Sequence, residues 1–196
     1  MVIGLTGRSG SGKSVASKFL LKQGFVIIDF DQIARGIYKS NSECLKEIIE
    51  HFGTDIIDEC NNLKREELAR IVFNNSEALK NLNRITHKYI YEEAIKIKEN
   101  NKDKNIVYDA PLLFEANLDI ECDYIISILS DDRMQIERII KRDHITEELA
   151  KKRLASQKPN NFFIEYSDFY IMNNSTIEKF EEKLKEILDI IMLDFN

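Results

Sequence analysis

The chain has 196 residues, of which 43% are hydrophobic and 32% are charged, and its formal net charge is −6. These values are ordinary for a globular protein and exclude an intrinsically disordered chain. The acidic balance excludes a broadly basic nucleic-acid binder, and no apolar run reaches the roughly 18 residues that a membrane span requires.

The three cysteines indicate neither a disulfide framework nor a zinc site. They are widely spaced, odd in number and without a CxxC pair. The N-terminal segment lacks the basic stretch and apolar stretch of a signal peptide. We therefore expect a cytoplasmic enzyme or binding protein without nucleic-acid or membrane partners, acting as a monomer or a small homo-oligomer.

Short apolar strands alternate with amphipathic helices along the chain. Strands are predicted at residues 2–6, 25–28, 106–108, 124–129 and 169–172, and helices at about 13–23, 32–40, 43–52, 65–74, 76–99, 132–142, 147–156 and 177–191. This alternation predicts an α/β fold with a parallel sheet covered by helices on both faces. Ligands of such sheets bind beyond the carboxyl ends of the strands, so the segments that follow strands should hold the site.

A glycine-rich segment follows the first strand. Residues 7–14 read GRSGSGKS and match the phosphate-loop pattern GxxxxGK[ST], although a glycine–serine turn with a chance lysine is the alternative. Glycines let successive N–H groups point into one concavity for phosphate oxygens, and the helix dipole adds positive charge. Lys13 should reach the β- and γ-phosphates, and the Ser14 hydroxyl should ligate Mg²⁺. The residues expected to contact ATP here are Gly7, Ser9, Gly10, Ser11, Gly12, Lys13, Ser14 and Val15.

Other sequence elements indicate which class of P-loop protein this is. No DxxG occurs, and residues 101–104 read NKDK, with lysine where the guanine-reading aspartate of NKxD belongs. No LSGGQ sequence is present. A short chain that is rich in helices after its second strand favours a small-molecule kinase over a GTPase or a transporter ATPase. A regulator that binds ATP without turnover is the non-enzymatic alternative.

Two carboxylates follow the second strand. Asp29 and Asp31 should lie beside the phosphate loop, where a kinase needs a group that orients a hydroxyl and accepts its proton. Arg35 could hold an anionic group of the acceptor. Spacing alone leaves open a structural alternative, in which Asp31 caps a helix and pairs with Arg35 across one turn.

Further charged residues follow the third and fourth strands. Asp109 ends the apolar run 106–108 at the Walker-B position, where a carboxylate assists Mg²⁺; a turn aspartate is the alternative. Arg138 and Arg142 lie one helical turn apart and could close over ATP, although most such helices are solvated surface helices. His87 by itself reads as a surface or packing residue.

Several segments together resemble the dephospho-coenzyme A kinase family, and they occur in the order of that family over about residues 3–174. They are residues 3–14, Ile28–Asp31 with Ala34 and Arg35, His87, Asp109–Glu115, Arg138 with Arg142 and Asp143, Arg153–Gln157, and Asn173 with Asn174. The phosphate loop is shared with many NTPases, whereas DxDxxAR and DxPLLFE together are much more specific.

The resemblance implies a P-loop NTPase fold with three layers and a five-stranded parallel sheet, similar to nucleoside monophosphate kinases. Its parts would be a core (about 1–31, 104–135 and 166–196), a helical acceptor-binding region (about 32–100) and a lid (about 136–160). It implies transfer of the γ-phosphate of ATP to the ribose 3′-hydroxyl of dephospho-CoA, with Mg²⁺ as cofactor.

The resemblance also implies roles for particular residues. Asp31 would be the base, and Arg142 would be the lid arginine that acts with Lys13 on the transferring phosphoryl group. Ser14 and Asp109 would place Mg²⁺, and Arg138 and Asn173 would contact ATP, with Asn173 near the adenine. The acceptor contacts would be Asp31, Arg35, His87, Leu112, Leu113, Phe114 and Glu115. From spacing alone, a kinase for another nucleoside or sugar hydroxyl remains the alternative.

Overall fold

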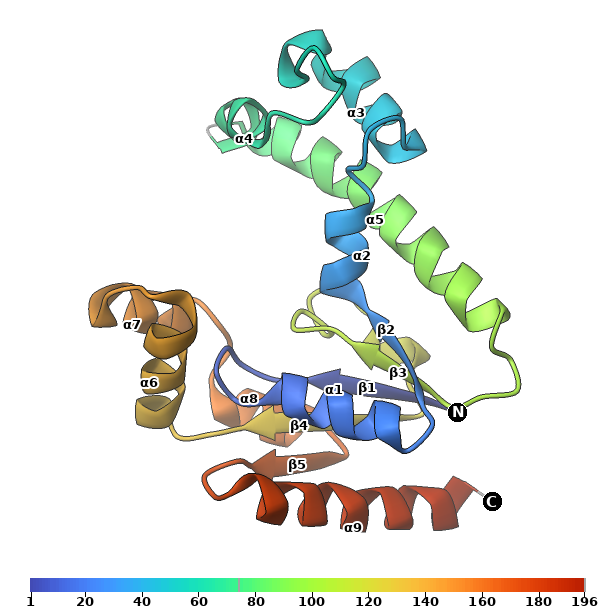
Figure 1. Ribbon diagram of the computed structural model, residues 1–196, viewed down its shortest axis with the longest axis vertical. Coiled ribbons are helices and arrows are strands. Elements are labelled where there is room, and N and C mark those ends of the chain that lie inside the picture. Colours follow the sequence, from blue (N-terminus) through green and yellow to red (C-terminus); the bar gives the residue numbers. More distant parts are fainter. Residues whose placement is uncertain (74, 196) are drawn as a thin grey trace. The chain divides into compact units, whose positions relative to one another are not determined.

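The computed structural model describes residues 1–73 and 75–195 (Figure 1). The chain forms two compact units, one of residues 1–28 with residues from 101 onward, the other of residues 29–100. Residues 136–160, the expected lid, cluster with the first unit. Their separate motion as a lid stays a prediction.

The first unit contains a five-stranded sheet with β1 at its centre. The strands are β1 (Val2–Thr6), β2 (Val26–Asp29), β3 (Ile106–Asp109), β4 (Tyr124–Leu129) and β5 (Phe169–Met172), in the order β2-β3-β1-β4-β5. The β1–β3, β1–β4 and β4–β5 pairs are parallel. The predicted α/β fold with a parallel sheet is therefore confirmed.

The register of the sheet brings the ends of β1 and β3 together. Leu5 of β1 lies opposite Asp109 of β3, and Thr6 lies opposite Ser127 of β4. The chain leaves β1 at Thr6 and enters the phosphate loop. The loop therefore starts beside the end of β3, as expected for a parallel sheet whose connections change direction at its central strand.

Helices α1 (Lys13–Lys22) and α9 (Ile177–Phe195) cover one face of the sheet. Ile3 and Leu5 alternate with Gly4 along β1, and both pack into a core that includes Leu20 and Leu184 from the two helices. Alternate residues of a strand point to the same face of the sheet, so Ile3 and Leu5 both face the two helices.

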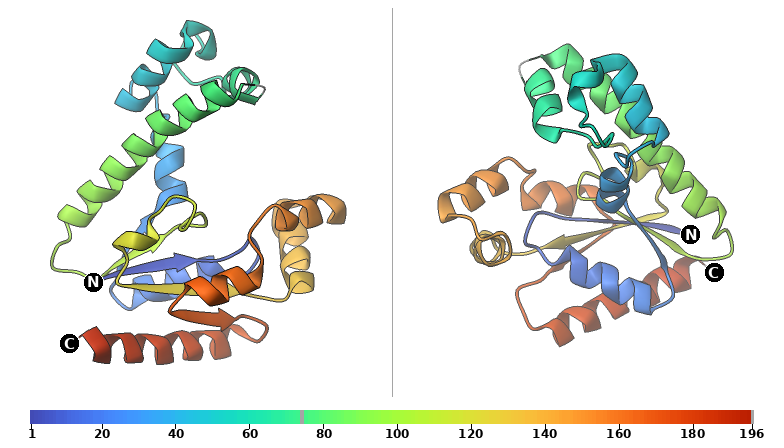
Figure 2. Two further views of the ribbon diagram at one scale, coloured as in Figure 1. Left: turned by 180° about the vertical axis from the view of Figure 1, so that it is seen from behind. Right: turned by 45° about the horizontal axis from the view of Figure 1, so that its top comes forward.

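The opposite face is covered by α8 (Asn160–Tyr166) and by the segment after β3; Figure 2 shows α8 on the side of the sheet away from α1. A Cβ on Gly4 would lie 2.9 Å from both Cys122 Sγ and a Leu113 methyl, so this face packs closely on β1. The three-layer prediction is confirmed. Helix α8 was not predicted from the sequence, because seven residues are too few for a reliable helical period.

Helices α6 (Asp132–Asp143) and α7 (Glu147–Ala155) form a hairpin in the same unit. Ile139, Ala150 and Leu154 pack between them. His144 takes a left-handed conformation (φ 52°) that ends α6, and the Thr146 hydroxyl accepts a hydrogen bond from Leu149 N to begin α7.

The second unit is helical. It contains α2 (Phe30–Gly36), α3 (Glu43–Phe52), the short 3₁₀ helix η1 (Thr54–Ile56), α4 (Arg65–Phe73) and α5 (Ser76–Glu99) around its own apolar core. The prediction of a helix at about 32–40 was wrong at both ends. Asp29 starts α2 early by accepting a hydrogen bond from Gln32 N, and the chain turns after Gly36.

No helix within residues 1–73 and 75–195 is both long enough and apolar enough to cross a membrane.

Candidate functional site

The phosphate loop after β1 includes Gly7 and Gly12, where only glycine can supply the backbone conformation. Gly7 has φ 145°, and a Cβ there would lie 2.1 Å from the Ile128 carbonyl oxygen. Gly12 has φ 103°, and its Cβ would lie 2.1 Å from Asn173 Nδ2. The loop is therefore both left-handed and tightly packed against β4 and the segment after β5, which fixes the direction of its amides.

The loop leads into α1 without a side-chain cap. Gly12 is the N-cap residue and makes no side-chain hydrogen bond to the first turn. The first N–H groups of a helix have no intrahelical acceptor, and together with the helix dipole they form an anion site. Lys13 and Ser14 are the first two residues of α1, and Ser14 is exposed. Both residues therefore lie at the start of this helix, and their contacts with phosphate and Mg²⁺ stay predictions.

Lys13 and Asp109 form an ion pair at the end of β3. Their side chains are only 16% and 7% exposed, so the pair is shielded from water. An unpaired ion at this depth would carry a large desolvation penalty, which the pairing offsets. The structure thus places the Asp109 carboxylate next to the phosphate-loop lysine, and the role of Asp109 toward Mg²⁺ stays a prediction.

Arg138 and Asn173 donate hydrogen bonds to carbonyl groups of the phosphate loop. Arg138 Nη1 donates to the Gly10 carbonyl at 3.2 Å, and its Nη2 donates to the Asn173 carbonyl at 3.0 Å. Asn173 Nδ2 donates to the Ser11 carbonyl at 2.8 Å. These bonds satisfy loop acceptors, so the two residues shape the cradle; their direct contact with ATP stays a prediction.

Arg142 is engaged with its neighbour at the end of α6. Its Nε and Nη2 donate to the two oxygens of Asp143 at 2.7 and 2.9 Å, and Arg153 of α7 also donates to Asp143. The Arg142 guanidinium, aided by Arg153, lowers the pKa of Asp143 to about 2, and the same hydrogen bond raises the pKa of Arg142. One carboxylate therefore orients two arginines of the α6–α7 hairpin.

Asp29, not Asp31, caps α2. Asp29 Oδ1 accepts from Gln32 N at 2.9 Å, whereas Asp31 is exposed in the first turn of the helix. Among the described ion pairs there is none between Asp31 and Arg35, which is also exposed. The structural alternative considered for Asp31 is therefore wrong, and a catalytic role for its carboxylate stays a prediction.

His87 is exposed on α5 of the second unit. Its neighbours Lys88 and Tyr89 bond Glu47 of α3, at 3.0 and 2.8 Å, and these bonds lower the pKa of Glu47. The residues beside His87 thus take part in the α3–α5 contact, while His87 itself is exposed.

The loop after β3 divides into a buried part and an exposed part. Leu113 is completely buried beneath β1, so its side chain fixes the loop rather than presenting itself to a ligand. Leu112 is 62% exposed and Glu115 is also exposed, while the Phe114 ring packs edge-on against Phe162 of α8 at 5.2 Å between centroids.

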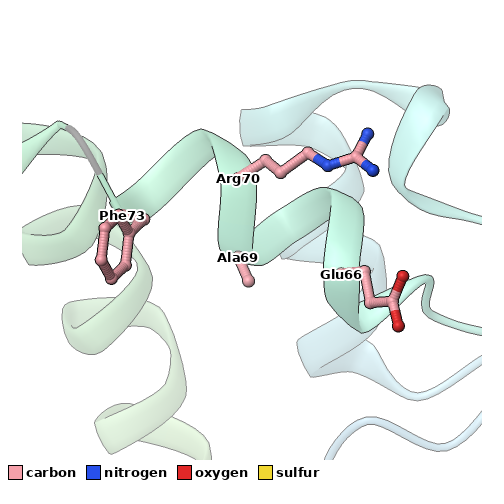
Figure 3. Close-up of a pocket in the computed structure, with 4 residues that line it drawn as sticks. All are labelled: Glu66, Ala69, Arg70 and Phe73. Atoms are coloured by element: carbon pink, nitrogen blue, oxygen red, sulfur yellow. The ribbon is translucent and has the colours of Figure 1, made fainter.

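A surface hollow of about 400 Å³ lies on α4, away from these groups in the chain. It is lined by Glu66, Ala69, Arg70 and Phe73, whose side chains Figure 3 shows along the helix. These four residues belong to the second unit and include none of those that the phosphate-loop pattern requires, so this hollow is not the phosphate site.

Two oxygen donors fit a Mg²⁺ ion. Mg²⁺ in phosphate-loop sites keeps water and phosphate oxygens and needs only one or two protein oxygens. The exposed Ser14 hydroxyl and the Asp109 carboxylate are hard donors of this kind. Within the described part of the chain no cluster of three or more His, Cys, Asp or Glu residues suggests another metal site.

A parallel sheet with a glycine-rich loop between β1 and α1, a lysine at the start of α1 and a carboxylate ending β3 defines a P-loop kinase fold. The model of the dephospho-CoA kinase family matches residues 1–179. A protein from Fusobacterium nucleatum named dephospho-CoA kinase is 42% identical over 191 residues, covering 97% of this chain and 98% of its own. One from Lactobacillus acidophilus is 36% identical and covers 95% of each chain. The chain belongs to the dephospho-CoA kinase family.

Solved structures share the fold of this chain. Dephospho-CoA kinase from Campylobacter jejuni has a TM-score of 0.69 at 28% identity, covering 97% of this chain and 96% of its own. TT1252 from Thermus thermophilus has a TM-score of 0.81 at 22% identity, covering 100% and 98%. A shikimate kinase from Acinetobacter baumannii has a TM-score of 0.52 at 14% identity, covering 98% of this chain and 93% of its own. This likeness shows the shared fold alone.

Gly12→Ala should weaken ADP binding about 10- to 100-fold, because the left-handed backbone and the contact with Asn173 both oppose a Cβ. Gly36→Ala is the matched control, since a Cβ there meets nothing within 4 Å. Isothermal titration calorimetry measures both. Binding within twofold of the unsubstituted protein in Gly12→Ala would contradict the cradle geometry.

Asp143 should titrate near pH 2, and Arg142→Ala should raise its pKa towards the ordinary value of about 3.9. A lowered pKa means that the stabilisation from this contact is complete above about pH 4 and is lost as the pH falls towards 2. Carboxyl ¹³C NMR follows the titration, with Lys141→Ala, an exposed neighbour, as the control. A midpoint near pH 4 in the unsubstituted protein would show that the arginine contact does not persist in solution.

Proposed function

We propose that this protein transfers the γ-phosphoryl group of ATP to the ribose 3′-hydroxyl of dephospho-CoA, giving coenzyme A and ADP. The observation that carries the proposal is the glycine-shaped phosphate loop with Lys13 paired to Asp109, in a chain that matches the family model over residues 1–179. None of the three cysteines forms a disulfide, which suits a reducing compartment, and we propose a cytoplasmic location and a monomer or small homo-oligomer.

The ATP side of the reaction is assigned to the first unit. The loop amides and the Lys13 ammonium would bind the β- and γ-phosphates, and this contact strengthens as charge moves onto the leaving group. Ser14 and Asp109 would hold Mg²⁺, which when bound neutralises phosphate charge. Arg142, oriented by Asp143, would stabilise the transferring group from the α6–α7 hairpin.

The acceptor side is assigned to α2, α5 and the loop after β3. The Asp31 carboxylate is exposed, and Asp29 rather than Asp31 caps α2. Asp31 would accept the proton of the 3′-hydroxyl while the 3′-oxygen forms a bond to the γ-phosphorus and the bond from the γ-phosphorus to the β–γ bridging oxygen breaks. Arg35, one helical turn from Asp31, would pair with an anionic group of the acceptor. His87, with Leu112, Phe114 and Glu115 on the loop that Leu113 anchors, would complete the acceptor contacts.

A coupled assay of ADP release tests the substrate. Dephospho-CoA, adenosine and shikimate are supplied separately with ATP and Mg²⁺, and mass spectrometry identifies the product. We expect turnover with dephospho-CoA and a product heavier by one phosphoryl group at the 3′-oxygen. Preference for adenosine or shikimate would replace the proposed acceptor. Nucleotide binding with no ADP release in the presence of any of the three acceptors would favour a regulator that binds ATP without turnover.

Asp31→Asn should lower kcat about 10²- to 10⁴-fold, because the amide cannot accept the hydroxyl proton. Asp29→Asn should leave kcat within about threefold, since asparagine also caps a helix. Steady-state kinetics at saturating dephospho-CoA compare the two. The reverse result would assign the base to Asp29, and normal turnover in both would remove this strand end from the chemistry.

A further inference from the structure

The two non-glycine residues at the start of the phosphate loop contact the end of α7. Ser9 N donates to Gln157 Oε1 at 3.0 Å, and Gln157 Nε2 donates to Ser9 Oγ at 3.1 Å. Arg8, only 8% exposed, donates to the Leu154 carbonyl at 3.1 Å and to Asp132 Oδ1 at 2.6 Å. The phosphate loop is thus joined to the α6–α7 hairpin by side-chain contacts far apart in sequence.

The Gln157 carboxamide matches Ser9 in a way that few side chains can. A backbone N–H only donates, so the carboxamide oxygen must face Ser9 N, and this leaves the NH₂ group to face the Ser9 hydroxyl. Gln157 follows the last residue of α7 by two positions, and the Leu154 carbonyl bonded by Arg8 belongs to the last turn. That carbonyl also accepts a hydrogen bond from Gln157 N at 3.2 Å, and the negative end of the α7 dipole favours a cation such as Arg8 beside it.

The same hairpin carries the arginines of the proposed reaction. Arg153 of α7 bonds Asp143, which bonds Arg142, and Arg138 of α6 bonds the Gly10 carbonyl. The loop is therefore fastened to α6 at Arg138 and Asp132, and to the end of α7 at Leu154 and Gln157. If the loop shifts at Ser9, either Gln157 moves with it or the two hydrogen bonds between Ser9 and Gln157 break.

We propose that Gln157 is a positioning residue, which couples phosphate binding in the loop to the placement of Arg142 and Arg153. The inference rests on the proposed function only in that the bound phosphates are those of a nucleotide used for phosphoryl transfer. Gln157 acts through Ser9 and α7. Because a displacement of about 1 Å at a reacting centre costs on the order of 10²-fold in rate, a two-bond contact at this point has a measurable effect on turnover.

Gln157→Ala should lower kcat about 10- to 100-fold while KM for ATP changes less than about threefold. Ser156→Ala is the matched control, because this exposed neighbour donates its hydroxyl hydrogen bond to Arg153 O within the last turn of α7. Gln157→Glu keeps an acceptor for both Ser9 N–H and Ser9 O–H but adds a negative charge beside the loop. It should restore part of kcat and raise KM for ATP about tenfold.

A double-mutant cycle separates coupling from general destabilisation. Ser9→Ala removes one of the two bonds, so its effect on kcat should be smaller than that of Gln157→Ala, and the double variant should be no slower than Gln157→Ala. Additive losses would show that the two residues act independently and would overturn the proposal, as would kcat of Gln157→Ala within twofold of the unsubstituted enzyme.

Amide hydrogen exchange with ADP tests the coupling without any acceptor. ADP should slow exchange in α7 of the unsubstituted protein and of Ser156→Ala, and Gln157→Ala should lose this protection while keeping protection of the loop. Retained α7 protection in Gln157→Ala would overturn the coupling. If dephospho-CoA is not phosphorylated, the proposed function fails, and this measurement still decides the role of Gln157.

Discussion

The fixed shape of the phosphate loop is the constraint on which the site depends. For its backbone N–H groups to face phosphate, its carbonyl groups need hydrogen-bond donors of their own. Arg138 donates to the Gly10 carbonyl and Asn173 donates to the Ser11 carbonyl. Gly7 and Gly12 allow β4 and the segment after β5 to approach where any Cβ would collide. A loop held in this way is already arranged for its ligand, so little ordering is needed when phosphate binds.

Carboxylates pair with the cations around this loop. Lys13 is paired with Asp109 and Arg8 with Asp132, and Asp143 pairs with two arginines of the α6–α7 hairpin. For the buried members Lys13, Asp109 and Arg8, pairing offsets the desolvation penalty of the charge. The lowered pKa of Asp143 also comes from pairing, since its ionised form is the one that the guanidinium groups favour.

Prediction from the sequence succeeded where local pattern and function coincide. The strands were predicted because buried parallel strands are short apolar runs, and the phosphate loop because its glycines and Lys13 have fixed spacing. Prediction failed for α8, which is short and held by tertiary contacts of Phe163 and Phe114. It also misplaced α2, because Asp29 and Asp31 have equal capping propensity and the end of the strand decides between them.

The sequence by itself determined the sheet, the phosphate loop and the chemical identity of the groups around it, because these follow from local pattern and residue type. Only the tertiary structure decided that Arg138 and Asn173 hold loop carbonyls, that Leu113 is buried, and that Ser9 bonds Gln157. Ser9 and Gln157 lie 148 positions apart along the chain. No local propensity records such a contact, since it exists only when the folded backbone brings the two segments together.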